Sequence, residues 1–110
     1  MESISLLALV AEHLQLAHQS GRGRSSHTIV GGHEHALRQT LIALVAEQVL
    51  ADHESPGEAT LQVLHGSVRL VTQTEAMDIV AGDIAAIPAG RHRLEAIQDA
   101  VALLTVAIRQ

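Results

Sequence analysis

Turn-forming residues divide most of the chain into short segments, and this feature constrains the fold more than any other. After Ser26, apolar runs recur between turn signals. The signals are Gly31-Gly32, Ser55-Pro56-Gly57, Gly66, Ala81-Gly82-Asp83 and Pro88-Ala89-Gly90. Many short strands at a spacing of about 8–12 residues are typical of a β-sandwich or barrel.

Several of these segments alternate apolar and polar residues with period two, as half-buried strands do. In the segment 58–65, Ala59, Leu61 and Val63 share one face, and polar residues occupy the positions between them. The longer run 37–46 has the composition of either a helix or a strand. Its Thr40 and the strands expected on both sides favour a strand.

The core must be built from aliphatic side chains alone. The 110 residues, which suit one domain, include no Phe, Trp, Tyr or Cys, so disulfides and thiolate ligands are excluded as well. Truncation of a core residue is therefore expected to be costly. The predicted core residues are Leu61, Val63, Val68, Leu70, Ile84, Leu94, Leu103 and Val106.

Charge and composition exclude two classes of partner. The formal charge of -5 and the lack of rings that stack on bases argue against nucleic acid. No apolar run approaches the roughly 18 residues that span a bilayer, so a membrane partner is not expected either. The first residues lack the basic start of a secretory signal, so the expected location is cytoplasmic.

The chain is expected to have three parts: an amphipathic helix over 1–20, a linker and first strand over 21–29, and a barrel domain over 30–110. The helical pattern covers 3–19. Its polar face lacks Lys and Arg, which favours packing against the domain or a second subunit over a membrane surface. The predicted polar face holds Ser5, Glu12, Gln15 and Gln19, and the apolar stripe holds Ile4, Leu7, Val10, Leu14 and Ala17.

Two stretches resemble the paired motifs of the cupins. The stretch from His53 to Gly66 is similar to the first motif, and the stretch from Gly82 to His92 is similar to the second, with its Pro-x-Gly turn. The resemblance covers roughly residues 30–108 and implies an all-β, cupin-type β-barrel (double-stranded β-helix or jelly roll) with a short N-terminal α-helix. It also implies a ligand pocket in the barrel mouth and a homodimer.

The metal half of the cupin pattern is incomplete. The resemblance implies a divalent metal held by two histidines and a glutamate of motif one and a histidine of motif two. His53 matches the first ligand, but Ser55 and Ala59 replace the next two, and His92 comes one residue early. Because such sites normally use three or more protein ligands, a Zn, Mn, Ni or Fe site at His53 and His92 needs a recruited ligand.

The other histidines differ in how well their spacing suits a metal ligand. His33 and His35 have a spacing that places both on one strand face if the segment is a strand, so they are the candidates for recruitment; a solvated turn is the alternative. His65 lies about 20 Å along the strand from position 59 and is expected at the far strand end. His13 and His18, five apart on the helix, are expected at the surface.

The predicted ligand pocket combines motif positions with one residue chosen by alternation. Because side chains alternate along a strand, either Arg38 or Gln39 must face the interior of the barrel. Gln39 lies on the same strand face as Leu41 and Ala43, so it is the predicted pocket amide. The full set is His53, Ser55, Ala59, Gln39, Leu61 and His92.

Three functions fit this sequence. The first is binding of an unidentified small molecule in the barrel mouth without a complete metal site. The second is a metal-dependent dioxygenase, isomerase or decarboxylase that uses His53 and His92 plus a recruited ligand. The third is a regulatory module that docks through the N-terminal helix. The sequence leaves open whether the chain is an enzyme. Apolar outward positions (Leu64, Ile97 and Leu104) and the helix stripe predict a homodimer.

Overall fold

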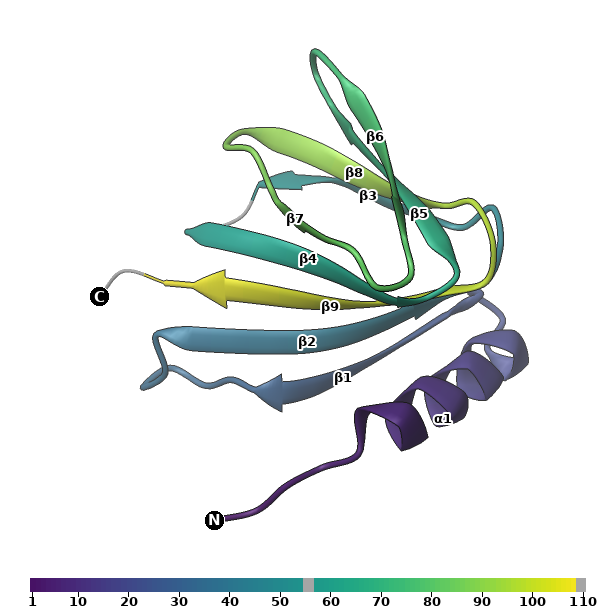
Figure 1. Ribbon diagram of the computed structural model, residues 1–110, viewed down its shortest axis with the longest axis vertical. Helices are drawn as coiled ribbons and strands as arrows, with labels where there is room; N and C mark the ends of the chain where they lie inside the picture. Colours follow the sequence, from purple (N-terminus) through teal and green to yellow (C-terminus); the bar gives the residue numbers. More distant parts are fainter. Residues whose placement is uncertain (55–56, 109–110) are drawn as a thin grey trace.

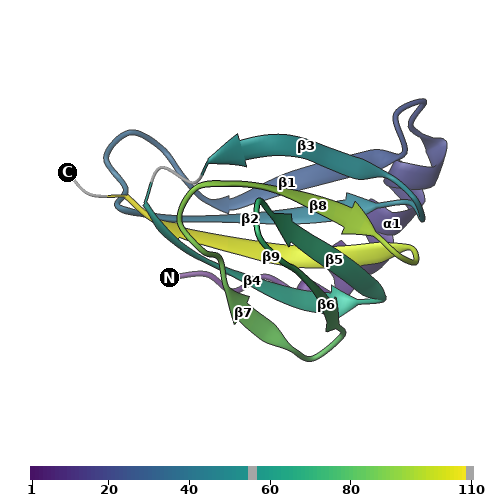
Figure 2. The same cartoon turned by 90° about the horizontal axis from the view of Figure 1, so that it is seen from above.

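The computed structural model describes residues 1–54 and 57–108; the side chain of His53 lies outside this description as well. Two antiparallel sheets face one another, and one helix lies beneath the larger sheet (Figures 1 and 2). The elements are α1 (Leu6–Gln19), β1 (Arg24–Val30), β2 (Leu37–Leu44), β3 (Val49–Glu54), β4 (Glu58–His65), β5 (Ser67–Thr72), β6 (Ala76–Val80), β7 (Ile84–Ala86), β8 (Arg91–Ala96) and β9 (Ala100–Ala107).

The strand order confirms the predicted jelly roll. The five-stranded sheet has the order β1-β2-β9-β4-β7, and the four-stranded sheet has the order β3-β8-β5-β6. The predicted strand over 37–46 forms as β2, and the predicted 58–65 segment forms as β4. Because β1 and β3 each have one hydrogen-bonded neighbour, both are edge strands. Within the described residues, no helix is long and apolar enough to cross a membrane.

The N-terminal helix packs on its own domain, over β1 and β2 (Figure 1). It begins after Ser5, whose Oγ accepts a hydrogen bond of 3.1 Å from the N–H of Ala8. Its buried face centres on His13 and Ala17. Ile4 and Leu7, predicted for the buried stripe, are exposed, so the face toward the sheet is rotated from the prediction.

Two aliphatic clusters result. One fills the space between the sheets, and the other lies between α1 and the outer face of the larger sheet. The predicted core residues are buried, with one exception. The clusters centre on Leu44, Leu61, Val63, Val68, Leu70, Ile79, Leu94, Ala96, Ala100 and Ala102 between the sheets, and on Ala17, Leu41, Ala43 and Val101 under the helix.

Two side-chain orientations differ from the prediction. Ile84 is 62% exposed because it pairs with Gln62 on the outer face of the short edge strand β7. Leu104, predicted to point outward, pairs with Leu61 and packs against the interior cluster. Ile79 of β6 is buried in the interior, a position the alternation did not single out.

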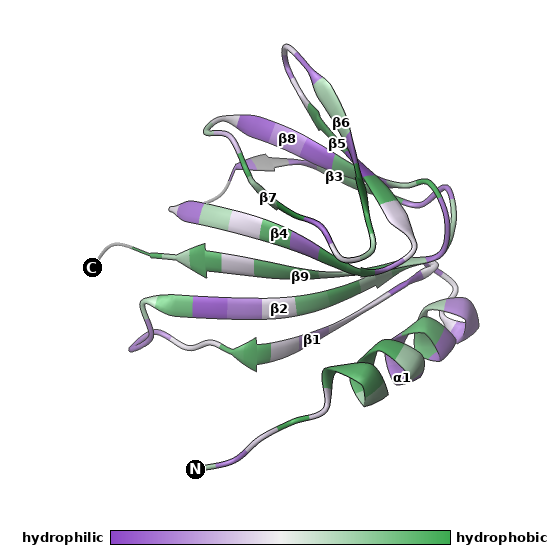
Figure 3. Ribbon diagram, viewed as in Figure 1, coloured by the Kyte–Doolittle hydropathy of each residue, from purple (hydrophilic) through white to green (hydrophobic). Residues whose placement is uncertain are grey.

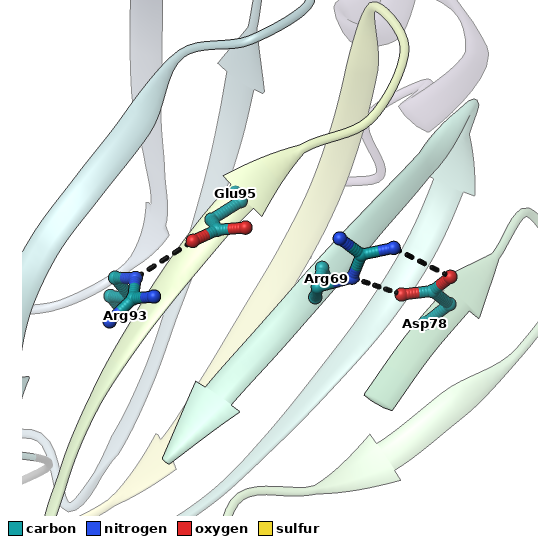
Figure 4. Close-up of polar contacts among 4 residues, drawn as sticks. All are labelled: Arg69, Asp78, Arg93 and Glu95. Atoms are coloured by element: carbon teal, nitrogen blue, oxygen red, sulfur yellow. Dashed lines mark hydrogen bonds and ion pairs between the residues drawn. The ribbon is translucent and has the colours of Figure 1, made fainter. Parts of the chain in front are cut away.

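Strand β8 of the four-stranded sheet is largely hydrophilic (Figure 3), and the outer face of this sheet carries two ion pairs. Arg69 and Asp78 face one another across β5 and β6 and form a bidentate pair with contacts of 2.7 and 3.2 Å, and Arg93 donates to Glu95 at 2.8 Å (Figure 4). The guanidinium of Arg69 lowers the pKa of Asp78, and the same hydrogen bond raises the pKa of Arg69. This face is built for contact with water.

The turn between β8 and β9 ties the helix to the sheet. The carboxylate of Asp99 accepts the N–H of Ala46 at 2.9 Å and lies 2.5 Å from Nε2 of His18. Two hydrogen bonds lower the pKa of Asp99; the one from Ala46 has the larger effect and the one with His18 the smaller. One side chain therefore links α1, the loop after β2 and the β8–β9 turn.

The interior cluster gives the first testable expectation. Leu61→Ala removes a side chain that is 2% exposed, and the resulting cavity should cost about 2–5 kcal/mol of unfolding free energy. The control Ile84→Ala, at an exposed site, should change it by about 0.5 kcal/mol or less. Urea unfolding measures both, and equal losses would contradict the assigned faces.

Gly66 gives the second expectation. It has a φ of 72°, and an added Cβ would lie 2.0 Å from the carbonyl oxygen of Asp99. Gly66→Ala therefore combines left-handed strain with a backbone clash and should cost more than about 2 kcal/mol. Gly82 has a φ of 94°, and an added Cβ would meet open space. Gly82→Ala should therefore lower the unfolding free energy only by the backbone strain, about 1 kcal/mol. Similar unfolding midpoints for the two variants would contradict this account.

Asp99 gives a pH-dependent expectation. Because folding lowers its pKa, its stabilisation is fully present above the unfolded value, near 3.8, and is lost as the pH falls through the lower folded value. Asp99→Asn should cost about 1 kcal/mol at pH 5, and the difference from the native chain should shrink toward pH 2. Urea unfolding of both proteins between these pH values measures the difference in unfolding free energy. A difference that stays constant with pH would be inconsistent with a titrating Asp99.

Candidate ligand site at the mouth of the jelly roll

Strand ends from both sheets meet at one end of the sandwich, on the left in Figure 1. Among them are the starts of β2, β4 and β8 and the ends of β3 and β9. The backbones of His53 and His92 lie directly opposite one another in the β3–β8 pair. The two motif histidines are thus neighbours in the sheet, as the resemblance implies. Ser55 falls outside the described residues.

His92 is a buried imidazole in an aliphatic wall. It is 4% exposed, and its Nδ1 lies 3.4 Å from the carbonyl oxygen of Gly90, a contact that favours the tautomer with hydrogen on Nδ1. Gly90, in the Pro-x-Gly turn, has a φ of 99° and turns the chain into β8. Around His92, a cavity is lined by Ile42, Leu50, Leu61, Leu70, Ile87, Leu94 and Leu104.

The cavity beside His92 has a volume of about 20 Å³. This is room for about one water molecule and far below the roughly 300–1,000 Å³ of ordinary ligand pockets. The aliphatic side chains from both sheets fill the space that a ligand would otherwise occupy. The space beside His92 is therefore too small to enclose a ligand of ordinary size.

The described side chains do not supply the ligand set that the cupin pattern implies. Ala59, at the position of the family glutamate, is 7% exposed on the inner face and brings no ligand atom. His33 and His35 lie in the exposed turn between β1 and β2, with Nε2 of His35 3.5 Å from Glu34. Among the described side chains, which do not include that of His53, no group of three or more His, Asp or Glu could hold a metal ion.

The predicted pocket amide is on the wrong face. Gln39 pairs with Thr105 and donates to its Oγ1 at 3.3 Å on the outer face of the larger sheet. Arg38, paired with Val106, shares the inner face with Ile42. The parity of Leu41 misled the prediction because that residue is buried under α1, not between the sheets.

Arg38, the alternative to Gln39 in the sequence, is the member of this pair that faces inward. Its Nε is buried and has no hydrogen-bond partner in the described part of the chain. A buried donor without an acceptor costs about 1–3 kcal/mol, so such groups in native proteins usually have a reason. Arg38 stands at the start of β2, at the same end as His92 on the facing sheet (Figure 1).

The remaining histidines do not join this site. His13, expected at the surface, lies on the buried face of α1 and is 6% exposed. Its Nδ1 lies 2.7 Å from Ser25 Oγ, and its ring centroid lies 5.4 Å from that of His27. Its i, i+4 spacing to Ala17 was the available signal for burial. His18 and His65 are exposed, as predicted.

Solved structures show what this chain is similar to. An RmlC-like cupin protein from Desulfovibrio desulfuricans matches with a TM-score of 0.76 and 22% identity over 97% of this chain and 96% of its own. A protein of unknown function from Streptococcus pyogenes, SPY1581, matches with a TM-score of 0.74 and 27% identity over 83% and 79%. No known family profile and no curated protein sequence matches the chain.

The chain is therefore a small protein with the cupin fold, and the resemblance noted in its two motifs is confirmed. Proteins with this fold include enzymes. Salicylate 1,2-dioxygenase from Pseudoaminobacter salicylatoxidans matches with a TM-score of 0.73 and 20% identity, over 91% of this chain but 30% of the dioxygenase. At such identities the likeness defines the fold and leaves the activity to be argued from the residues.

Proposed function

We propose that this cupin-fold protein binds a small molecule at the mouth of the jelly roll without a complete set of protein metal ligands. The observation that carries the proposal is the buried imidazole of His92 in an otherwise aliphatic wall. Ligand sites combine apolar walls with a few polar groups that fix orientation. Ala59, which stands at the position of the family glutamate and brings no ligand atom, argues against a metal centre.

Arg38 supports the same proposal from the facing sheet. Its buried Nε is a donor without an acceptor, and a ligand with a carbonyl or carboxylate oxygen would supply one. In this arrangement Arg38 orients the polar end of the ligand. His92 contacts the ligand from the four-stranded sheet, and Leu61 and Ile87 exclude water from the apolar part.

A metal-dependent enzyme is the second candidate. The backbones of His53 and His92 pair directly, and a metal site of this kind would use the imidazoles of both residues. A third protein ligand would have to join them, and His33 and His35 are the candidates that the sequence offers. Binding by two imidazoles would weaken as the pH falls, since protonated imidazole does not ligate.

The regulatory module is the least supported candidate. The face of α1 that carries His13 and Ala17 is already buried against its own sheet. Docking to another protein through that face would require the helix to detach. A cytoplasmic location stays part of the proposal and rests on the sequence alone.

The test for mouth binding compares two histidines. A screen of small carboxylates and amides by saturation-transfer NMR should give ligands whose binding weakens at least about tenfold in His92→Ala, equivalent to about 1.4 kcal/mol. Arg38→Met should weaken carboxylates more than amides. The control His65→Ala removes an exposed imidazole from the other end of β4 and should leave binding unchanged.

Two results would contradict this proposal. One is ligands that bind the native chain and His92→Ala equally. The other is equal weakening in His92→Ala and His65→Ala. Circular dichroism of each variant confirms that the fold is intact.

We also propose a homodimer. Exposed apolar side chains remain on both flanks of α1, where Leu7 is 85% and Leu16 41% exposed. Exposed apolar side chains of this kind favour self-association. Light scattering at tens of micromolar should give twice the chain mass, and Leu7→Glu with Leu16→Glu should give the monomer. Ile84→Glu, at an exposed position on β7, is the control and should stay dimeric; a native monomer would refute the proposal.

A further inference from the structure

An open groove runs along the side of the sandwich between β1 and β3, which lie on the same side of the molecule (Figure 2). Its volume is about 590 Å³, within the range of small-molecule sites. It is separate from the mouth, although Ile42 and Leu50 line both this groove and the cavity beside His92. The lining residues are Ser20, Arg22, Arg24, Ser25, Ser26, Thr40, Ile42 and Leu50.

The groove is positively charged in a protein whose formal charge is -5. Arg22 and Arg24 line it, and no Asp or Glu is among its described lining residues. Elsewhere the pattern differs: Arg69 and Arg93 are neutralised by carboxylates on the outer face of the smaller sheet. Among the ion pairs formed by residues 1–54 and 57–108, none involves Arg22 or Arg24.

The floor of the groove is apolar. Ile42 and Leu50 are partly buried and pack against the interior cluster. Ser26 pairs with Ile42 across β1 and β2, so its hydroxyl lies on the same face as this floor, next to the arginines. The groove therefore offers guanidinium groups and hydroxyls beside an aliphatic surface, the complement of a molecule with one anionic end and one apolar end.

We propose that the groove between β1 and β3 binds a small organic anion. Arg22 and Arg24 bind its anionic head, which guanidinium groups can hold by bidentate hydrogen bonds. Ser26 and Thr40 donate further hydrogen bonds to it, and its apolar body lies on Ile42 and Leu50. This site is additional to the ligand at the mouth and does not depend on His92.

The test uses a matched pair of fluorescent probes: 1-anilinonaphthalene-8-sulfonate, an organic anion, and N-phenyl-1-naphthylamine, its uncharged counterpart. The chain has no Trp or Tyr, so it contributes no emission of its own. The anion should bind the native protein at least about tenfold more tightly than the uncharged probe. A tenfold difference in affinity corresponds to 1.4 kcal/mol of binding free energy.

The variants then locate the binding. Arg22→Gln with Arg24→Gln should reduce the affinity for the anion to that for the uncharged probe. Arg91→Gln, which removes the same type of charge from an exposed position on β8, should change it less than about twofold. Ser26→Trp keeps both arginines but fills the groove, and it should abolish binding of both probes. His92→Ala should leave the anion's affinity unchanged.

The proposal is overturned by any of three results: no binding of the anion to the folded native chain, equal affinity for the two probes, or equal loss in the groove and Arg91 variants. A loss in His92→Ala alone would assign the anion to the mouth and would likewise overturn it. Circular dichroism and the urea midpoint of each variant show whether the fold is retained.

Discussion

The aliphatic contact between the two sheets is the interaction on which the rest of this structure depends. Leu61 and Val63 of the larger sheet meet Val68, Leu70 and Leu94 of the smaller one, and all are nearly inaccessible to water. With no aromatic ring available, close packing of small branched side chains has to fill this space. The fit leaves about 20 Å³ beside His92, so the centre of the jelly roll is a core rather than a pocket.

Because aliphatic side chains fill the interior, the polar groups that could bind a ligand lie at its edges. Aliphatic residues occupy most of the described inner faces, and Ala59 stands where the cupin pattern has a glutamate ligand. Polar groups are found instead at the margins. Arg38 and His92 stand at the mouth, and Arg22 and Arg24 stand in the groove between the edge strands. The outer faces are used for helix docking on one side and for ion pairs on the other.

The turns and the period-two segments were sufficient to predict the fold, because Gly66 and Gly90 mark turns where the backbone adopts a positive φ, a conformation that favours glycine. The faces of individual strands were harder to predict. The larger sheet is covered on both sides, by the other sheet and by α1, so an apolar residue can face either way. Gln39 was therefore assigned inward and Arg38 outward, the reverse of what the register shows.

Side chains whose role depends on distant elements could not be read from local patterns. His13 is buried because β1 supplies Ser25 and His27 beneath the helix. The Asp99 carboxylate joins His18 and Ala46 across more than 50 residues of sequence. Ile84 has the composition of a core residue but lies on a short edge strand, where the sheet exposes its outer face.

Metal content is the most direct test of the central claim, which is that the cupin frame here encloses an aliphatic core and not a metal centre. The chain would be purified without a histidine tag from medium supplemented with Zn, Mn, Ni and Fe salts, and analysed by elemental mass spectrometry after gel filtration. We expect each metal to be far below stoichiometric, and His92→Ala to give the same values. Stoichiometric metal in the native chain that is lost in His92→Ala would contradict this account.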